Sequence, residues 1–486
     1  MKIKKLLGSL IAGTAMLAIA GIASADTKNI NIYGASAQFS YWQAAMPYFL
    51  QNQSCNPIQW AASSDGNHMI VKATCGSDTV YVRYSNKASF DGLAAVKGND
   101  GTAFLPTGAS AQCTSTNDTS STPGYDRLML DETICTFVNA FDGNGNPTTP
   151  GACGTTATKC VPVTMAASDV KASSFLQKSM GAVNGPAGNP SGQSNLSYTQ
   201  RNFSATTLNT AGLTSMNPFV VPFGFFVNKS VQQQIPYGTG TWNTISNISR
   251  LMAVSIFSGG VYSWKDFGAD YGVFTAANGG GTEVTGDPIN VCLRHAGSGS
   301  HATLDAAVIK GNGWGGTLLT QQKVNQSYID GSGNVRNIYF NDGTGNEMDC
   351  INGGDWSANP GGTNGGINWT GYGAIGYADA DRANKTNTVG PLNYQGFAPS
   401  RVNIRNGRYD FWTLQWLYWD ATNNADYIAN STLINAMETF IDTPSNMNLV
   451  TSKAAYYATK PEMKVTKATA DLSYPSRQTA TNPQTP

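Results

Sequence analysis

The sequence has little charge, few histidines and, past its first residues, no long apolar run. Charged residues make up 12% of the 486, and 30 Lys plus Arg balance 30 Asp plus Glu. This balance excludes the basic face expected of a nucleic-acid-binding protein. No stretch after residue 25 reaches the roughly 18 apolar residues that a membrane-spanning helix needs, so we expect no membrane span. Three histidines are too few for a Cys/His zinc site, and neither a metal nor a cofactor is expected.

The N-terminus is the exception to the shortage of apolar runs. Three lysines within the first five residues precede an apolar run over 6–22, and Ala23-Ser24-Ala25 has the small-x-small pattern of a cleavage site. Together these features are typical of a secretory signal peptide covering residues 1–25. We therefore expect a soluble, exported chain, located in the periplasm or outside the cell.

Cysteine is present in an even number, as exported proteins with disulfides require. The sequence contains no CxxC or CxxCH motif, which excludes redox-motif and c-type haem assignments. Pairing of nearest neighbours is the simplest of the 105 possible connectivities. It predicts the bonds Cys55–Cys75, Cys113–Cys135, Cys153–Cys160 and Cys292–Cys350.

Apolar residues recur with alternating strand and helix periods, which predicts an α/β fold with mostly parallel sheets. The expected strands are 29–33, 220–228 and 373–378. One helix is expected after Gly34, and two more over 250–259 and 431–442. The segment 408–419 is expected to be a strand pair or a strand-to-helix passage. Residues 99–216 contain four cysteines and long Gly, Asn, Thr and Pro runs, so we expect a disulfide-stapled, loop-rich insertion outside the sheets. Residues 459–486 lack apolar periodicity and are expected to be an exposed tail.

Small hydroxyl residues precede an expected helix at three places: "GASAQF" (34–39), "ASSDGNHMIV" (62–71) and "RHAGSGSHATLD" (294–305). A capped helix after a tight turn is the plain interpretation of each. An oxyanion site is the alternative, because helix N-termini offer unpaired N–H donors and Arg294 adds a charged fork of donors.

An ordered set of motifs resembles the periplasmic phosphate-binding proteins of ABC transporters. The set comprises "YGASAQFSYW", "ASSDG", "VPFGFFVNKS", "IFSGGVYSWKDFG", "RHAGSGS" and "GAIGYADAD", in the family's order. The resemblance implies a type II periplasmic-binding fold, in which two α/β lobes joined by two crossing strands clamp an anion. It implies one lobe from 26–98 and 383–458, and the other from 217–382.

The resemblance also implies the ligand-binding residues and a partner. Matching the motifs residue by residue assigns phosphate contacts to Gln38, Phe39, Ser63, Asn86, Arg294, Ser298, Gly299 and Ser300. It implies an inorganic oxyanion as ligand and an ABC transporter permease as partner, with no catalysis.

Two positions depart from the family pattern. Asn86 and Ala296 stand where the family has aspartates. Because an aspartate rejects fully ionised anions by repulsion, its loss predicts poor discrimination between phosphate and sulfate and little dependence on pH. A decayed anion site, on a fold reused for an extracellular matrix or adhesion role, is the second hypothesis.

A secreted hydrolase is the enzymatic alternative. "GASAQ" is similar to the G-x-S-x-G nucleophile elbow, with Ser36 as the nucleophile, but Gln38 replaces the last glycine. A catalytic triad would also need His68, His295 or His301 as its base.

Overall fold

The computed structural model describes residues 25–97, 113, 126–154, 157–175, 179–180, 202–203, 210–294, 297–309, 326–329, 335–341, 343–353, 371–382, 388–467 and 476–477. Residues 1–24 of the expected signal peptide, several parts of the 99–216 segment and most of the expected C-terminal tail lie outside these ranges. Among the residues that the structure describes, no helix is both long and apolar enough to cross a membrane.

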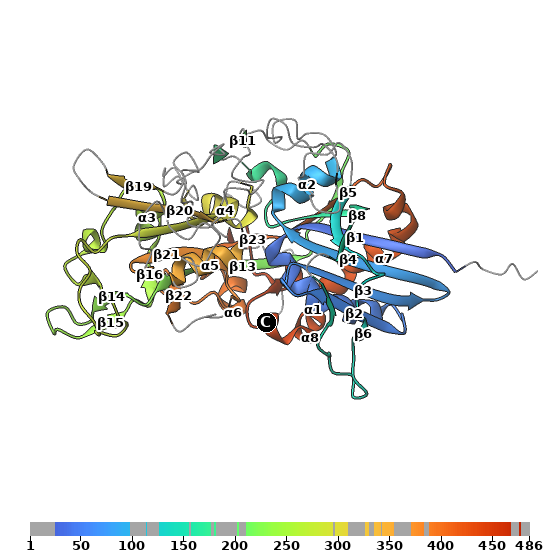
Figure 1. Ribbon diagram of the computed structural model, residues 1–486, viewed down its shortest axis with the longest axis horizontal. Coiled ribbons are helices and arrows are strands. Elements are labelled where there is room, and N and C mark those ends of the chain that lie inside the picture. The colour runs from blue at the N-terminus through green and yellow to red at the C-terminus, as the bar shows by residue number, and fades with distance from the viewer. Residues whose placement is uncertain are drawn as a thin grey trace, which may run out of the picture.

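Two α/β lobes lie side by side along the longest axis of the molecule, each built on its own sheet (Figure 1). The sheet of lobe I has the strand order β12 (Thr214–Met216), β24 (Trp416–Trp419), β9 (Met165–Ser168), β1 (Thr27–Ala35), β4 (Asp78–Lys87), β3 (His68–Cys75), β2 (Ile58–Ser63) and β6 (Val138–Asn139), with β7 (Gly151–Cys153) also on β2. The sheet of lobe II has the order β16 (Asn247–Ile248), β22 (Val389–Tyr394), β13 (Phe219–Asn228), β21 (Ala374–Asp379), β18 (Asn290–Arg294), β20 (Val335–Asn341) and β19 (Gln326–Ile329). The predicted α/β class is confirmed, but the sheets are mixed rather than mostly parallel, because β3 and β24 in lobe I and β13 and β19 in lobe II pair antiparallel with their neighbours.

Helices cover both faces of each sheet. In lobe I, α1 (Ser36–Asn52), α7 (Ala425–Ile441) and α8 (Pro444–Leu449) share one apolar cluster, whereas α2 (Ser89–Lys97) packs in a second cluster. In lobe II, α3 (Arg250–Phe257), α4 (Gly299–Leu304) and the π-helical turn Asp305–Ile309 lie in the main core. The helix α5 (Thr344–Asn352) packs in a separate cluster with the Cys292–Cys350 disulfide.

Two connections cross between the lobes. The first half of β13 pairs with β23 (Trp412–Leu414) and β25 (Ala458–Thr459), and its second half pairs with β21 and β22 in lobe II. The chain then returns through β23 to β24, which pairs with β9 in lobe I. The aromatic segment 408–419 is therefore a pair of short strands, and the two crossing strands that the sequence resemblance implied are present.

The remaining elements are small. A three-stranded sheet joins β14 (Val231–Gln234), β15 (Trp242–Thr244) and β17 (Tyr271–Val273), and further pairs are β5 (Asp126–Leu130) with β8 (Thr158–Pro162), β10 (Ser179–Met180) with β11 (Asn202–Phe203), and β26 (Val465–Thr466) with β27 (Ser476–Arg477). The short helices α6 (Arg401–Arg405) and α9 (Thr451–Ala454) and the 3-10 turns Ala172–Ser174, Trp264–Phe267 and Lys460–Glu462 complete the described chain.

Several sequence expectations about these elements are wrong. No helix follows Ser63, because the chain turns back at once and β2 pairs with β3 as an antiparallel hairpin. The segment 99–216 is not separate from the sheets, since β9 pairs in parallel with β1 and β6, β7 and β12 extend the same sheet. The strand β22 belongs to the sheet of lobe II, although 383–458 was expected in lobe I. Residues 459–467 are not an exposed tail, because Thr459 and Lys467 are buried.

Two of the four predicted disulfides are present and two are re-paired. Cys55–Cys75 and Cys292–Cys350 form as predicted. The other four cysteines pair as Cys113–Cys160 and Cys135–Cys153. The reason is local pairing: an antiparallel bridge places Cys135 directly opposite Cys153, with 4.5 Å between their Cα atoms.

Candidate functional site

The carboxyl ends of the parallel strands in both sheets face one another, and a helix starts after most of them. In lobe I, α1 follows β1 and α2 follows β4; in lobe II, α4 follows β18 and α5 follows β20. Carboxyl ends of strands are where open α/β sheets usually bind ligands. The residues at this junction are called the interlobe site below: Ser36, Ser89, Asp169, Arg294, Ser298, Gly299, Ser300 and Thr344.

Direct contacts join these helix starts across the two lobes. The hydroxyl of Ser36, the first residue of α1, lies 3.4 Å from the hydroxyl of Thr344, the first residue of α5. The backbone N–H of Phe90 in α2 donates to the carbonyl of Gly297, before α4, at 3.2 Å. Neither α1 nor α5 has a side-chain cap at its N-terminus. The positive ends of both helices therefore bring N–H groups without a capping side chain to the junction.

Arg294 ends β18 and is buried, with 2% of its surface exposed. Its Nη1 donates to the Thr344 hydroxyl at 2.9 Å, and its backbone N–H donates to the Tyr377 hydroxyl at 3.1 Å. A buried guanidinium retains its charge at any physiological pH. Arg294 is therefore a fixed positive charge at the interlobe site.

Asp169 is the acid of the interlobe site, and it follows directly after β9. Its Oδ2 accepts from the Ser89 hydroxyl at 3.2 Å, while its backbone N–H donates to the same hydroxyl at 3.0 Å. Burial and the neighbouring Asp379 raise the pKa of Asp169 to about 7, although Ser89 and Arg294 act in the opposite direction. Near neutral pH this carboxyl is therefore divided between its protonated and ionised forms.

Gly299, the first residue of α4, lies directly against this carboxyl. A Cβ at position 299 would collide with the Ser89 hydroxyl and would lie 2.6 Å from Asp169 Oδ2. Glycine is thus required for the closed arrangement of the two lobes. Ser298 caps α4, accepting from the His301 N–H at 3.5 Å, and the buried Ser300 Oγ has no partner within the described ranges.

Further acids lie around Arg294 in lobe II. Burial raises the pKa of Glu347 well above its usual value, although Arg294 lowers it, and its Oε1 accepts from the Tyr377 N–H at 3.2 Å. Burial alone would raise the pKa of Asp379. The positive charges of Arg382 and Lys453 lower it by more, so the pKa of Asp379 lies below its ordinary value. The pKa values of these two buried acids are therefore shifted in opposite directions.

The sequence-predicted ligand residues fall into two groups. Arg294, Ser298, Gly299 and Ser300 are brought together at the interlobe site, and their role as ligands stays a prediction. Gln38 and Phe39 lie in the first turns of α1 nearby, but their side chains are used in packing. Gln38 Nε2 donates to the carbonyls of Ser168 and Trp416 at 2.9 and 2.8 Å, and the Phe39 ring packs against Tyr84.

The roles of Ser63 and Asn86 as ligands also stay predictions, and the printed contacts of their side chains are with other residues of lobe I. Ser63 ends β2, and β3 and β4 separate it from β1 in the sheet, a distance of roughly 14 Å at the usual strand spacing. Its hydroxyl bonds with Asp65 and accepts from the His68 N–H. The side chain of Asn86 donates to Asn67 at 3.4 Å near the surface.

Sequence reasoning missed Asp169 and Ser89. Both had a signal: "MAASD" is a short buried run that ends in an acid, and "NKASFDG" places a serine at a helix start after a strand. Asp169 was missed because residues 99–216 were expected outside the sheet, and without Asp169 the Ser89 hydroxyl had no evident partner. The parallel pairing of β9 with β1 instead brings Asp169 to the same edge as α1.

The hydrolase hypothesis needs a histidine base, and the described histidines are engaged elsewhere. His301 Nδ1 lies 2.6 Å from the Tyr377 hydroxyl, and burial, with a smaller effect of Arg294, lowers the pKa of His301 to about 3. So low a pKa makes a weak general base near neutral pH. His68 Nδ1 lies 2.7 Å from the Ser85 hydroxyl. His295 lies outside the described residues.

A pocket is also present away from this junction. It has a volume of about 510 Å³ and is lined by residues at the C-terminal end of α1 and by the adjoining loops, including Gln51, Cys55 and Phe141. The length of α1, roughly 25 Å for its 17 residues, separates it from the interlobe site.

Comparison with known proteins finds likeness only among solved structures. No family model matches the chain, and no curated protein matches it. A putative phosphate ABC transporter substrate-binding protein with bound phosphate from Clostridium perfringens is 12% identical, with 88% of this chain and 99% of that chain covered and a TM-score of 0.40. An ABC-type phosphate transport receptor from Vibrio cholerae is 11% identical, with 89% and 99% covered and a TM-score of 0.39. PstS from Borrelia burgdorferi is 12% identical, with 89% and 98% covered and a TM-score of 0.32.

Proposed function

We propose that this chain binds a tetrahedral oxyanion, phosphate or a close analogue, at the interlobe site. The observation that carries the proposal is the burial of the Arg294 guanidinium at a junction where four helices begin. A guanidinium supplies a permanent charge and a fork of donors, and helix starts supply N–H groups directed at the same place. The buried Ser300 Oγ, which has no partner among the described residues, adds a hydroxyl donor.

Asp169 determines which oxyanions the site accepts in this proposal. An ionised carboxylate beside the ligand repels a fully ionised anion such as sulfate, whereas hydrogen phosphate brings a proton that the carboxylate can accept. This changes the expectation of poor discrimination, which assumed that no carboxylate faced the ligand. The motif resemblance further supports export and delivery of the anion to an ABC transporter permease.

Calorimetry on purified, ligand-stripped protein tests the proposal. Phosphate, arsenate, sulfate and molybdate are titrated into wild type and Arg294→Ala. Loss of one partner of a buried charged contact commonly costs about 2–5 kcal/mol, so we expect phosphate binding to weaken by roughly 30-fold or more. Arg408→Ala, which removes an exposed arginine, is the matched control and should bind as wild type does.

Two results of this calorimetry would contradict the proposal. If no oxyanion binds at millimolar concentration, or if Arg294→Ala binds as tightly as wild type, the proposed site is wrong. The extracellular matrix or adhesion role would then be the alternative to test.

A further inference from the structure

We infer that residues 453–467 form a strap that fastens lobe I to lobe II, with Lys453, Tyr457 and Asp381 as its latch. The inference concerns the opening of the lobes and does not depend on which ligand, if any, the protein binds. Residues 459–467 of this strap belong to the segment that the sequence predicted as an exposed tail.

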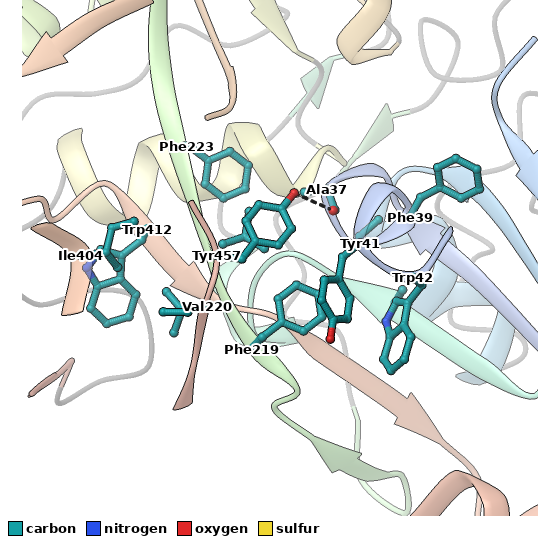
Figure 2. Close-up of a cluster of buried hydrophobic side chains, with 14 of the residues drawn as sticks. Ala37, Phe39, Tyr41, Trp42, Phe219, Val220, Phe223, Ile404, Trp412 and Tyr457 are labelled. Atoms are coloured by element: carbon teal, nitrogen blue, oxygen red, sulfur yellow. Dashed lines mark hydrogen bonds between the residues drawn. The ribbon is translucent and has the colours of Figure 1, made fainter. Parts of the chain in front are cut away.

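Tyr457 contacts both lobes through one hydroxyl. Its Oη donates at 3.2 Å to the carbonyl of Ala37, in the first turn of α1, and lies 3.2 Å from Oδ1 of Asp381, in the turn after β21. Its ring is fully buried and stacks on Phe219 of the crossing strand β13, with centroids 5.7 Å apart. Figure 2 shows the ring between α1 and β13, with its hydroxyl directed at Ala37.

Lys453 adds an ion pair to the same contact. Its ammonium group pairs with the Asp381 carboxylate, and the side chains are only 13% and 3% exposed. Lys453 belongs to α9, which packs on α8 beside α1 and therefore moves with lobe I. Because breaking a buried ion pair leaves an uncompensated charge, separating Asp381 from Lys453 is costly.

The rest of the strap holds both crossing connections. Its strand β25 pairs with β13, and the Lys467 ammonium donates to the carbonyls of Asp410 and Trp412, before and within β23. Glu462 accepts two bonds from Arg401 of α6, at 3.1 and 2.7 Å. A hinge movement of β13 against β23 must therefore either break these contacts or move residues 453–467 together with the two strands.

Amide hydrogen exchange of the full-length, ligand-free chain tests the latch. The double variant Lys453→Met/Tyr457→Phe should raise exchange at least about 10-fold in the first turn of α1 and in the turn 379–382, because a local opening then costs less free energy. Exchange in β1 and β4 should stay at the wild-type rate. Small-angle scattering should give a larger radius of gyration for the variant than for wild type.

Lys460→Met is the matched control, since Lys460 lies on the same strap with an exposed side chain, and it should behave as wild type. Unchanged exchange at both turns of the double variant would overturn the inference. An equal rise in β1 and β4 would overturn it as well, because it would mean general destabilisation. Phosphate binding is not used in the measurement, so these outcomes are separate from the failure of the proposed function.

Discussion

At the scale of single residues, the unusual feature of this chain is an acid buried against a helix start. Asp169 is fully buried between Ser89 and Gly299, and its pKa is raised to about 7, first by burial and then by Asp379. Between about pH 4 and pH 7 the unfolded chain has released this proton while the folded chain keeps it, so the free energy of unfolding falls as pH rises. Ionised Asp169 therefore destabilises the folded protein, by up to about 4 kcal/mol.

Replacing Asp169 by Asn should remove that cost. We expect Asp169→Asn to be more stable than wild type at pH 8, and the difference to vanish as pH falls towards about 4, where both forms are neutral. Urea unfolding at a series of pH values measures it. Identical pH dependence in the two proteins would mean that Asp169 does not hold a proton in the fold.

Asp169→Asn also tests whether Asp169 makes the site discriminate between sulfate and phosphate. In wild type, sulfate affinity should fall as pH rises from about 6 to about 8, because Asp169 ionises beside the anion. In Asp169→Asn the sulfate affinity should hardly change over this range. Calorimetry at both pH values measures the effect, and a flat sulfate profile in wild type would remove Asp169 from the selectivity argument.

At the scale of elements, the sequence predicted those with strong periodicity. The helix after Gly34, the strand at 220–228 and the strand at 373–378 are all present as α1, β13 and β21. Short elements escaped prediction because four residues such as "MAAS" in β9 carry too little pattern to be read as a strand. That one omission concealed Asp169, since only pairing with β1 shows where the residue lies.

The close contact between α4 and α2 makes Gly299 a sensitive position. Gly299→Ala should force the two lobes apart at this point, because the added Cβ meets the Ser89 hydroxyl and the Asp169 carboxyl. We expect a lower midpoint of thermal unfolding and weaker oxyanion binding. Gly143→Ala is the control, as a Cβ there meets nothing within 4 Å. Equal behaviour of the two variants would show that the lobes are not in contact at Gly299.

The disulfide Cys292–Cys350 joins two elements of the interlobe site. It fastens β18, which ends in Arg294, to α5, whose first residue Thr344 accepts from Arg294. Replacing both cysteines by Ala should lower the free energy of unfolding by about 4 kcal/mol for a separation of 58 residues, and weaken oxyanion binding. The Cys135–Cys153 pair is the comparison: its removal should destabilise the fold and leave binding unchanged. Urea unfolding with calorimetry distinguishes the two, and an equal effect on binding would contradict the assignment.

At the scale of the whole molecule, two lobes meet at the carboxyl ends of their strands, and the C-terminal strap connects them. The resemblance of motifs implied this architecture and placed Arg294 at the junction. It also assigned Ser63 as a ligand, and this stays a prediction, since the Ser63 hydroxyl bonds with Asp65 and accepts from the His68 N–H at the start of the β2–β3 hairpin. Composition carried no signal for the strap, whose contacts through Tyr457, Glu462 and Lys467 depend on residues distant in the sequence.

A crystal structure of the protein with arsenate tests the central claim most directly, because anomalous scattering from arsenic locates the anion. We expect one strong peak at the interlobe site, with arsenate oxygens within hydrogen-bonding distance of the Arg294 guanidinium and beside the carboxyl of Asp169. The peak should be lost in crystals of Arg294→Ala. A peak elsewhere in wild-type crystals, with Arg294 and Asp169 uninvolved, or no peak at saturating arsenate, would contradict the account.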